Sequence, residues 1–442
     1  MKKLIVLILA LCLLLPGCGQ QPAETTATTA AVEVPQPVEA KWDYGSINTK
    51  TGADRAVEQG TSLRTRNYLP IRAYSDILPK AGYSLNWFVY DAEETFLGSG
   101  ASFSGNGVGV SVEKMLKANP DGVYFRLVLQ SAYENDSIVL DEKVPILFYT
   151  ADEPWEAPMT TKMVAAIGSK QSGGIQDGEA FGDRLFVFDA VGTMNVYDVN
   201  TGEHLDACSL GNKDLLTPHV NSASFSNQYY AEGDTYPLIY TSMYNNLTPS
   251  NQYLLGTCCV YRITESAGQF SAQLVQVIRI GFIGDANLWT PYNDSRPFGN
   301  FVVDTDRNMF YALVPRDKTS TTRFLGFSLP KPDAGTYKEE YGCNQVILQA
   351  TDIKRQFDVS YISSPQGCTY HDGKIYSVEG FGSFESAPPF LRVINVETGM
   401  IVRSVNLGQM GLIKEPEVIT VANEQLYYLA IDGMLYKLSF AE

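Results

Sequence analysis

The chain has 442 residues and a formal net charge of −16 at pH 7, because Asp and Glu outnumber Lys and Arg. Nucleic-acid phosphates and anionic lipid headgroups are bound through Lys and Arg. The composition therefore argues against a nucleic-acid partner and against electrostatic attachment to a membrane. A neutral ligand, such as most sugars, is indifferent to this charge.

The first residues indicate export. Two lysines precede Leu4–Leu15, an apolar run that is too short to span a bilayer as a helix and is typical of a signal peptide at residues 1–17. The run ends in Leu-Pro-Gly-Cys, which resembles the lipobox of bacterial lipoproteins, although Pro16 is less usual there. The resemblance implies lipidation at Cys18 and an extracytoplasmic protein anchored to the bacterial cell membrane. The alternative is a secreted protein with a chance Cys.

Residues 18–40 follow as a tether that we expect to be disordered. They are rich in Ala, Thr, Pro, Gln and Glu and contain no aromatic residue, so they cannot bury enough apolar surface to order the backbone. Five further cysteines follow, and their number and spacing fit no zinc site or disulfide framework. We expect Cys258 and Cys259 to be neighbours on a strand that point to opposite faces, with a strained vicinal disulfide as the alternative. The five are Cys208, Cys258, Cys259, Cys343 and Cys368.

Residues 41–150 predict a small antiparallel β-sandwich. Short runs of β-branched and aromatic residues alternate with turn residues, and only residues 111–119 have a helical pattern. RTRNYLPI followed by GYSLNWFVYD resembles β-sandwich modules of bacterial surface proteins and phage tail proteins. In such modules the fold often binds carbohydrate or positions a neighbouring domain.

From residue 151 onward a hairpin-like unit recurs. The units are centred near residues 185, 238, 310, 375 and 426, so successive units lie 53, 72, 65 and 51 residues apart. Repeats of this length suit four-stranded blades of a β-propeller. We therefore expect an all-β chain in which residues 151–442 form a β-propeller with five blades, or with six as the alternative.

Two further observations support the propeller. VYDVNTGEHL and VINVETGMIV resemble the outer hairpins of PQQ-like and YVTN-like propellers. The fifth unit is one strand short, and residues 161–169 can supply that strand from the start of the domain. This closure would remove the exposed edge of an open array.

Each unit also carries polar residues shortly before its first strand. Side chains that converge on the axis from separate blades are a way for a propeller to build a ligand pocket. Each of them alone could instead satisfy a buried backbone group or bind water. The candidate axial residues are Gln171, Gln176, His219, Asn221, Asn300, Gln366, Glu415 and Glu417.

Other motifs do not indicate chemistry. His371 and Asp372 belong to an Asp-Gly turn without a third orienting group. Residues 304–308 begin like a calcium loop but lack its Gly and its final Glu, so they predict a hairpin turn. Glu415 and Glu417 would project from one strand, whereas a glycosidase needs carboxylates on both sides of the bond. That reading would require a partner from another blade, such as Asp294 or Asp304. No metal or cofactor is expected.

The region 165–440 also resembles the five-bladed propellers of phage receptor-binding proteins and related bacterial surface proteins. The matching residues are His219 with Asn221, Gln366 with Gly367, and the segment Glu415-Pro416-Glu417. The resemblance implies glycan or cell-wall-polymer binding. We therefore favour binding without turnover, with a polysaccharide-degrading glycosidase or lyase and a protein-interaction scaffold as the alternatives.

Overall fold

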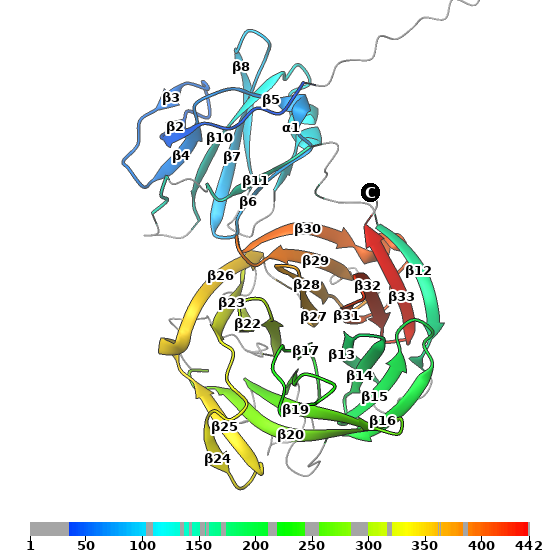
Figure 1. Ribbon diagram of the computed structural model, residues 1–442. Helices are drawn as coiled ribbons and strands as arrows, with labels where there is room; N and C mark the ends of the chain where they lie inside the picture. Colours follow the sequence, from blue (N-terminus) through cyan, green and yellow to red (C-terminus); the bar gives the residue numbers. More distant parts are fainter. Residues whose placement is uncertain are drawn as a thin grey trace, which may run out of the picture. The chain divides into compact units, whose positions relative to one another are not determined.

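The computed structural model describes residues 35–102, 109–132, 137–140, 144–150, 155, 159–168, 174–210, 219–243, 256–283, 299–315, 321–360, 362, 364–382 and 388–440. The signal-peptide segment, Cys18 and most of the tether lie outside these residues. Within them the protein is all-β, with many antiparallel sheets and one α-helix (Figure 1). No helix of the described part is long and apolar enough to cross a membrane.

Two sheets and a short ribbon make up the region between residues 42 and 149. The described residues of the whole chain also contain three 3₁₀ turns, at Ile71–Ala73, Ala350–Asp352 and Leu407–Met410. The larger sheet has the order β1 (Trp42–Tyr44), β4 (Ser62–Thr65), β10 (Tyr124–Ser131), β7 (Tyr83–Tyr90) and β8 (Phe96–Ser102), with β5 (Leu69–Pro70) beside β10. The smaller sheet has the order β11 (Ile146–Tyr149), β6 (Asp76–Pro79) and β9 (Val110–Ser111). The ribbon pairs β2 (Ser46–Ile47) with β3 (Asp54–Arg55).

The predicted helix is present as α1 (Val112–Ala118). The Ser111 side chain accepts a hydrogen bond from the Lys114 N–H at 3.2 Å, which caps the helix N-terminus. Met115 of α1 is fully buried, together with Leu85 and Leu127 of the larger sheet and Ile77 of the smaller one. The alternating strands therefore bury their apolar faces in one core that both sheets and the helix share.

The described residues from 159 to 440 contain five further sheets, which we call the ring sheets. They are arranged around a common centre in Figure 1. We number them here, and in each the first strand named lies innermost.

Sheet 1 has the order β13 (Ile175–Phe181), β14 (Arg184–Asp189), β15 (Thr193–Asp198) and β16 (His204–Ser209). Sheet 2 has the order β17 (Ala223–Phe225), β18 (Ile239–Ser242), β19 (Thr257–Ser266), β20 (Gln269–Ile280), β25 (Cys343–Leu348) and β24 (Thr336–Lys338). Sheet 3 has the order β21 (Asn300–Asp304), β22 (Met309–Pro315), β23 (Thr321–Ser328) and β26 (Ile353–Ser360). Sheet 4 has the order β27 (Pro365–His371), β28 (Lys374–Glu379), β29 (Phe390–Asn395) and β30 (Met400–Asn406). Sheet 5 has the order β31 (Pro416–Ala422), β32 (Gln425–Ala430), β33 (Met434–Phe440) and β12 (Met159–Ala166).

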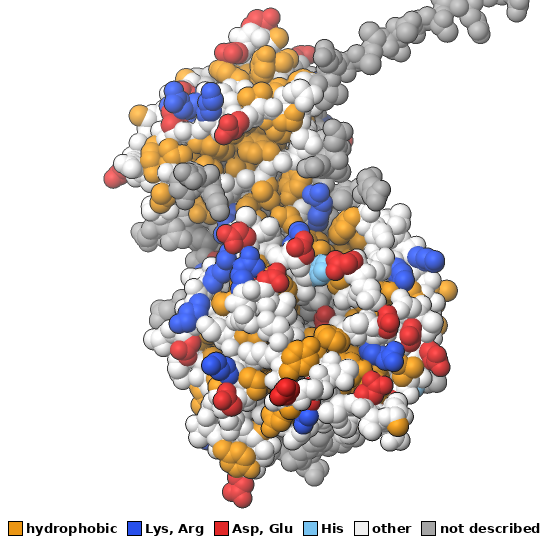
Figure 2. Space-filling view, in the orientation of Figure 1, with side chains coloured by type: hydrophobic (Ala, Val, Ile, Leu, Met, Phe, Trp, Pro, Cys, Tyr) orange, Lys and Arg blue, Asp and Glu red, His pale blue; other side chains and the backbone are white. Residues whose placement is uncertain are grey.

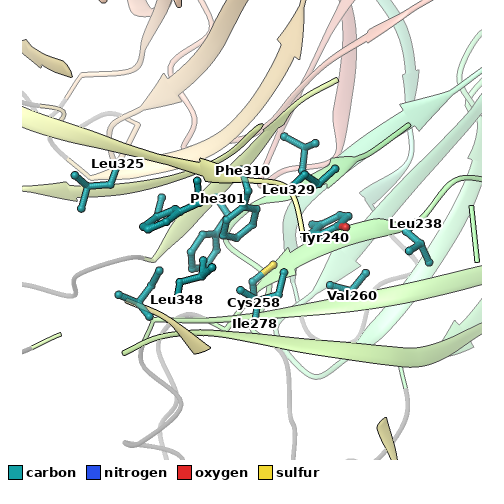
Figure 3. Packing of buried hydrophobic residues seen from close by; sticks show 14 of the residues in the cluster. Leu238, Tyr240, Cys258, Val260, Ile278, Phe301, Phe310, Leu325, Leu329 and Leu348 are labelled. Atoms are coloured by element: carbon teal, nitrogen blue, oxygen red, sulfur yellow. The ribbon is translucent and has the colours of Figure 1, made fainter. Parts of the chain in front are cut away.

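An apolar cluster fills the space between each ring sheet and the next. The cluster between sheets 2 and 3 includes Tyr240, Cys258 and Ile278 from one side and Phe301 and Phe310 from the other (Figure 3). Four similar clusters occupy the other interfaces, including the one between sheets 5 and 1. Because both faces of a sheet are covered, neighbouring residues of one strand serve different clusters.

The cysteines show this alternation. Cys258 lies in the cluster between sheets 2 and 3, and Cys259 lies in the cluster between sheets 1 and 2. The expectation that the two side chains point to opposite faces is therefore confirmed. All five cysteines that follow the tether are free thiols.

Sheet 5 is completed from the start of the ring region. Strand β12 pairs antiparallel with β33 from Met159↔Phe440 to Ala166↔Met434, so the pairing predicted for residues 161–169 is present. The innermost strands contact one another in the cyclic order β13, β17, β21, β27, β31 and back to β13. This arrangement brings the starts of five strands to one central region.

Candidate functional site

Four of the predicted axial residues form two hydrogen-bonded pairs in this central region. The His219 Nε2 lies 2.6 Å from the Gln176 Oε1, and the Gln366 Nε2 donates to the Glu415 Oε1 at 2.8 Å. The four side chains come from the starts of sheets 1, 2, 4 and 5. All except Gln366 are half-buried, so the two pairs lie where the central region meets solvent.

Asn221 and Asn300 join three of the inner strands. The Asn221 Nδ2 donates to the Asn300 Oδ1 and to the Pro365 O, both at 3.0 Å. The Asn300 Nδ2 donates to the Asn221 O at 3.1 Å and to the Gln366 O at 2.7 Å. Both side chains are buried, and both amide groups donate to protein oxygens. These two residues therefore satisfy backbone groups and hold the strand starts together.

A second group of polar residues lies deeper. Asp177 is fully buried and accepts hydrogen bonds from the Gly178 and Ala223 N–H groups, both at 2.7 Å. Gly367 leaves room for it, because a Cβ there would lie 2.3 Å from the Asp177 Oδ1 and 2.3 Å from the Glu417 O. Burial nevertheless raises the pKa of Asp177 well above its ordinary value, against the lowering effect of these backbone hydrogen bonds.

Glu417 is buried next to this group, with 3% of its surface exposed. Burial raises its pKa well above the ordinary value of Glu, and the nearby charges of Glu415 and Asp177 raise it further. Burial also raises the pKa of Glu415, which the hydrogen bond from Gln366 partly opposes. Protonation therefore removes negative charge from this region at a higher pH than exposed carboxyls would allow.

Glu179 forms a third contact across the sheets. Its Oε1 accepts hydrogen bonds from the Thr369 Oγ1 at 2.8 Å and the Thr420 Oγ1 at 3.0 Å, which belong to sheets 4 and 5. Its Oε2 is buried and has no hydrogen-bond partner among the described residues. Burial raises the pKa of Glu179 well above its ordinary value, and the charge of Asp177 adds to the rise.

The sequence analysis missed Asp177, which directly follows the predicted Gln176, and Glu179, two residues further on. A period-two reading of IQDGEAF would have placed Asp177 and Glu179 on the same face of the innermost strand. Of the residues that it did propose, the structure brings together all but Gln171, which lies outside the described residues.

The other motifs have structural roles. Asp304 accepts hydrogen bonds from the Asp306 and Arg307 N–H groups and forms the hairpin turn predicted for residues 304–308. His371 reaches the Glu424 Oε2 at 3.1 Å at the opposite ends of the inner strands. Gly373 of its turn has a φ of +72°, as the Asp-Gly turn requires. Asp294 lies outside the described residues.

This site combines half-exposed amide, imidazole and carboxyl groups with a buried acidic layer beneath them. In the part of the chain that the structure describes, no group of three or more His, Cys, Asp or Glu residues could hold a metal ion. The groups that reach solvent are suited to hydrogen bonding with a polar ligand.

No protein-family profile matches this chain, and no curated protein matches it either. Among solved structures it is similar to a glutaminyl cyclase from Myxococcus xanthus, with 9% identity, a TM-score of 0.38, and coverage of 64% of this chain and 97% of that one. It is also similar to the computationally designed protein Ika8, with 10% identity, a TM-score of 0.29 and coverage of 63% and 100%. A third similar structure is Sqt1 of Saccharomyces cerevisiae, with 8% identity, a TM-score of 0.26, and coverage of 69% of this chain and 65% of that one. Likenesses of this size carry no conclusion about function.

We expect Asn300→Ala to lower the free energy of unfolding by about 2–4 kcal/mol, because it leaves two buried carbonyl groups without a donor. Chemical denaturation of the purified protein measures this loss. Asn227→Ala is the matched control, because the Asn227 Nδ2 also makes two hydrogen bonds, at 2.8 Å each, but is exposed. That variant should lose less than about 1 kcal/mol. Equal losses would contradict a structural role for the buried amide.

We expect Glu179→Gln to be more stable than the wild type at alkaline pH. The folded pKa of Glu179 is raised, so the folded state holds this proton after the unfolded state has released it. The free energy of unfolding therefore falls as pH rises from the ordinary titration range of Glu toward the raised pKa. The amide variant lacks this fall. Denaturation curves of the variant and the wild type at pH 4–9 should show a gap that widens with pH. A gap that is constant with pH would contradict the assignment.

Proposed function

We propose that this protein is a bacterial surface lipoprotein whose residues 41–150 form a β-sandwich module and whose residues 151–442 form a five-bladed β-propeller. The five ring sheets, the five apolar clusters between them and the β12–β33 pairing support the blade count. The lipobox at Cys18 supports extracytoplasmic attachment to the cell membrane through a lipid.

We further propose that the central site binds carbohydrate or cell-wall polymer without turnover. The observation that carries this proposal is the half-exposed pair Gln176–His219 beside the pair Gln366–Glu415, contributed by four different sheets. Amide, imidazole and carboxyl groups both donate and accept hydrogen bonds, as a sugar hydroxyl requires. The raised pKa values of Glu415 and Glu417 reduce the negative charge of the site, which suits a neutral ligand.

A glycosidase or lyase is the second candidate, because Glu415 and Glu417 interact and both have raised pKa values. However, both lie at the start of one strand. The two carboxyls of sheet 1 are both buried: Asp177 has both of its oxygens engaged with backbone N–H groups, and Glu179 accepts from the hydroxyls of Thr369 and Thr420. Of these four described carboxyls only Glu415 is not buried, so no second one reaches solvent from another sheet to face it across a glycosidic bond, and this favours binding over turnover.

We expect the full chain to bind a glycan or cell-wall polymer on an array and to release no reducing ends from it. Gln366→Ala and His219→Ala should weaken the binding about tenfold each, because each removes a hydrogen-bonding group from the site. Gln356→Ala, which removes an exposed glutamine from the outer strand β26, serves as the control and should bind as the wild type does.

If the wild type releases reducing ends and Glu417→Gln does not, the protein is a glycosidase or lyase and the proposal of binding without turnover is wrong. Wild-type binding by both Gln366→Ala and His219→Ala would place the ligand elsewhere. A chain that binds no glycan on the array would point to a protein partner.

A further inference from the structure

Sheet 2 of the ring carries a hairpin that the other ring sheets lack in the described residues. The chain leaves β23 of sheet 3, forms β24 and β25, and then returns to sheet 3 as β26. Strand β25 pairs in parallel with β20 from Gln276↔Asn344 to Ile280↔Leu348, and β24 lies outside β25. This detour extends the outer edge of sheet 2 and builds a groove of about 510 Å³ beside it.

Hydrogen bonds fix the walls of this groove. The Gln276 side chain is fully buried, and its Nε2 donates to the Lys331 O at 2.8 Å and the Ala334 O at 3.2 Å. The Asn344 Nδ2 donates to the Asp333 O at 3.0 Å. The loop that carries Pro332 and Asp333 is therefore held against the strands, and the groove is formed before any ligand arrives.

Two exposed tyrosines line the groove. Tyr230 is 45% exposed and Tyr337 is 63% exposed. The Arg262 guanidinium lies 5.3 Å from the centre of the Tyr230 ring, and its hydrogen bonds to Asp234 hold it there. The Tyr230 ring therefore packs against a guanidinium that is itself held in place. Figure 2 shows hydrophobic side chains, which include Tyr, at the surface over the β24–β25 hairpin and close to acidic ones.

The remaining groups define the chemistry of a ligand. Gln273, Asp333 and Asn344 supply amide and carboxylate groups to the groove, and none of the described residues that line it is Lys or Arg. The nearby Arg262 is paired with Asp234, so the groove offers no free countercharge to a phosphate or to another anion. Aromatic faces beside planar hydrogen-bonding groups suit a molecule with both apolar faces and many hydroxyls.

We propose that this groove is a second carbohydrate-binding site, which takes a neutral oligosaccharide by stacking on Tyr337 and Tyr230. The groove is separate from the central site, because the two share no residue. The proposal for the groove therefore rests on its own observations. Two sites on one chain would allow a single polymer to be held at two points, which raises the overall affinity.

The test is isothermal titration of the full chain in detergent with five neutral probes: maltohexaose, cellohexaose, xylohexaose, mannohexaose and chitohexaose. We expect at least one probe to bind. Tyr337→Ala should weaken this binding about threefold to tenfold through loss of the stacked ring, and Tyr337→Phe should retain it. Tyr229→Ala is the matched control, since Tyr229 is 46% exposed and adjacent to Tyr230 but does not line the groove.

The same titration in Gln366→Ala separates the two sites. Binding that persists in Gln366→Ala and is lost in Tyr337→Ala supports the groove independently of the central site. Binding that is lost in Gln366→Ala but unchanged in Tyr337→Ala overturns the groove and leaves the central site standing. Binding of none of the five probes, or an equal loss in Tyr229→Ala, also overturns it.

Discussion

The structure of the ring region depends on how the inner edges of five strands are satisfied. Strands β13, β17, β21, β27 and β31 each pair with a second strand on one side only, and the other edge faces the centre. A buried strand edge with unpaired N–H and C=O groups is costly. Side chains of neighbouring sheets supply the partners. The Ser222 and Ser224 hydroxyls accept from the Phe301 and Val303 N–H groups, and the Thr420 hydroxyl accepts from the Ala180 N–H.

This constraint explains why the centre is polar, and it divides the polar residues into two kinds. Asn221, Asn300 and Asp177 each form hydrogen bonds with the backbone of adjacent strands. The Gln176 Oε1 and the His219 ring instead pair with each other at the half-exposed end, while the Gln176 Nε2 donates to the Ile175 O of its own strand. The first kind fixes the distances between sheets, and the second kind is positioned by them. A ligand site at the centre would thus be held rigidly by the same contacts that close the ring.

The sequence predicted the elements whose signals are local. Short patterns predicted the helix near residues 111–119, the opposite orientations of Cys258 and Cys259, and the pairing of residues 161–169 with the last strand. The repeat also predicted that most of the central residues lie together, because it placed each of them shortly before the first strand of its unit. Local patterns did not reveal that Asn221 and Asn300 bond to each other, since that contact joins residues 79 positions apart.

Two features could not be predicted for physical reasons. The β24–β25 hairpin lies within the third repeat unit, yet it joins the sheet of the second, and no pattern in its own residues specifies a partner in another unit. The roles of Asp177 and Glu179 depend on burial by other sheets. The same two residues in an open strand would be ordinary exposed acids, and only the closed ring raises their pKa values.

The chain contains three histidines, and their positions provide a direct test of the central site. His219 lies at the half-exposed end, His371 at the opposite ends of the inner strands, and His204 on the outer strand β16. The most direct measurement is nuclear magnetic resonance of the histidine ring signals during titration with peptidoglycan and wall-polysaccharide fragments. The proposal predicts that the His219 signal shifts with ligand while those of His204 and His371 stay in place. A ligand that binds and leaves the His219 signal unchanged would contradict it.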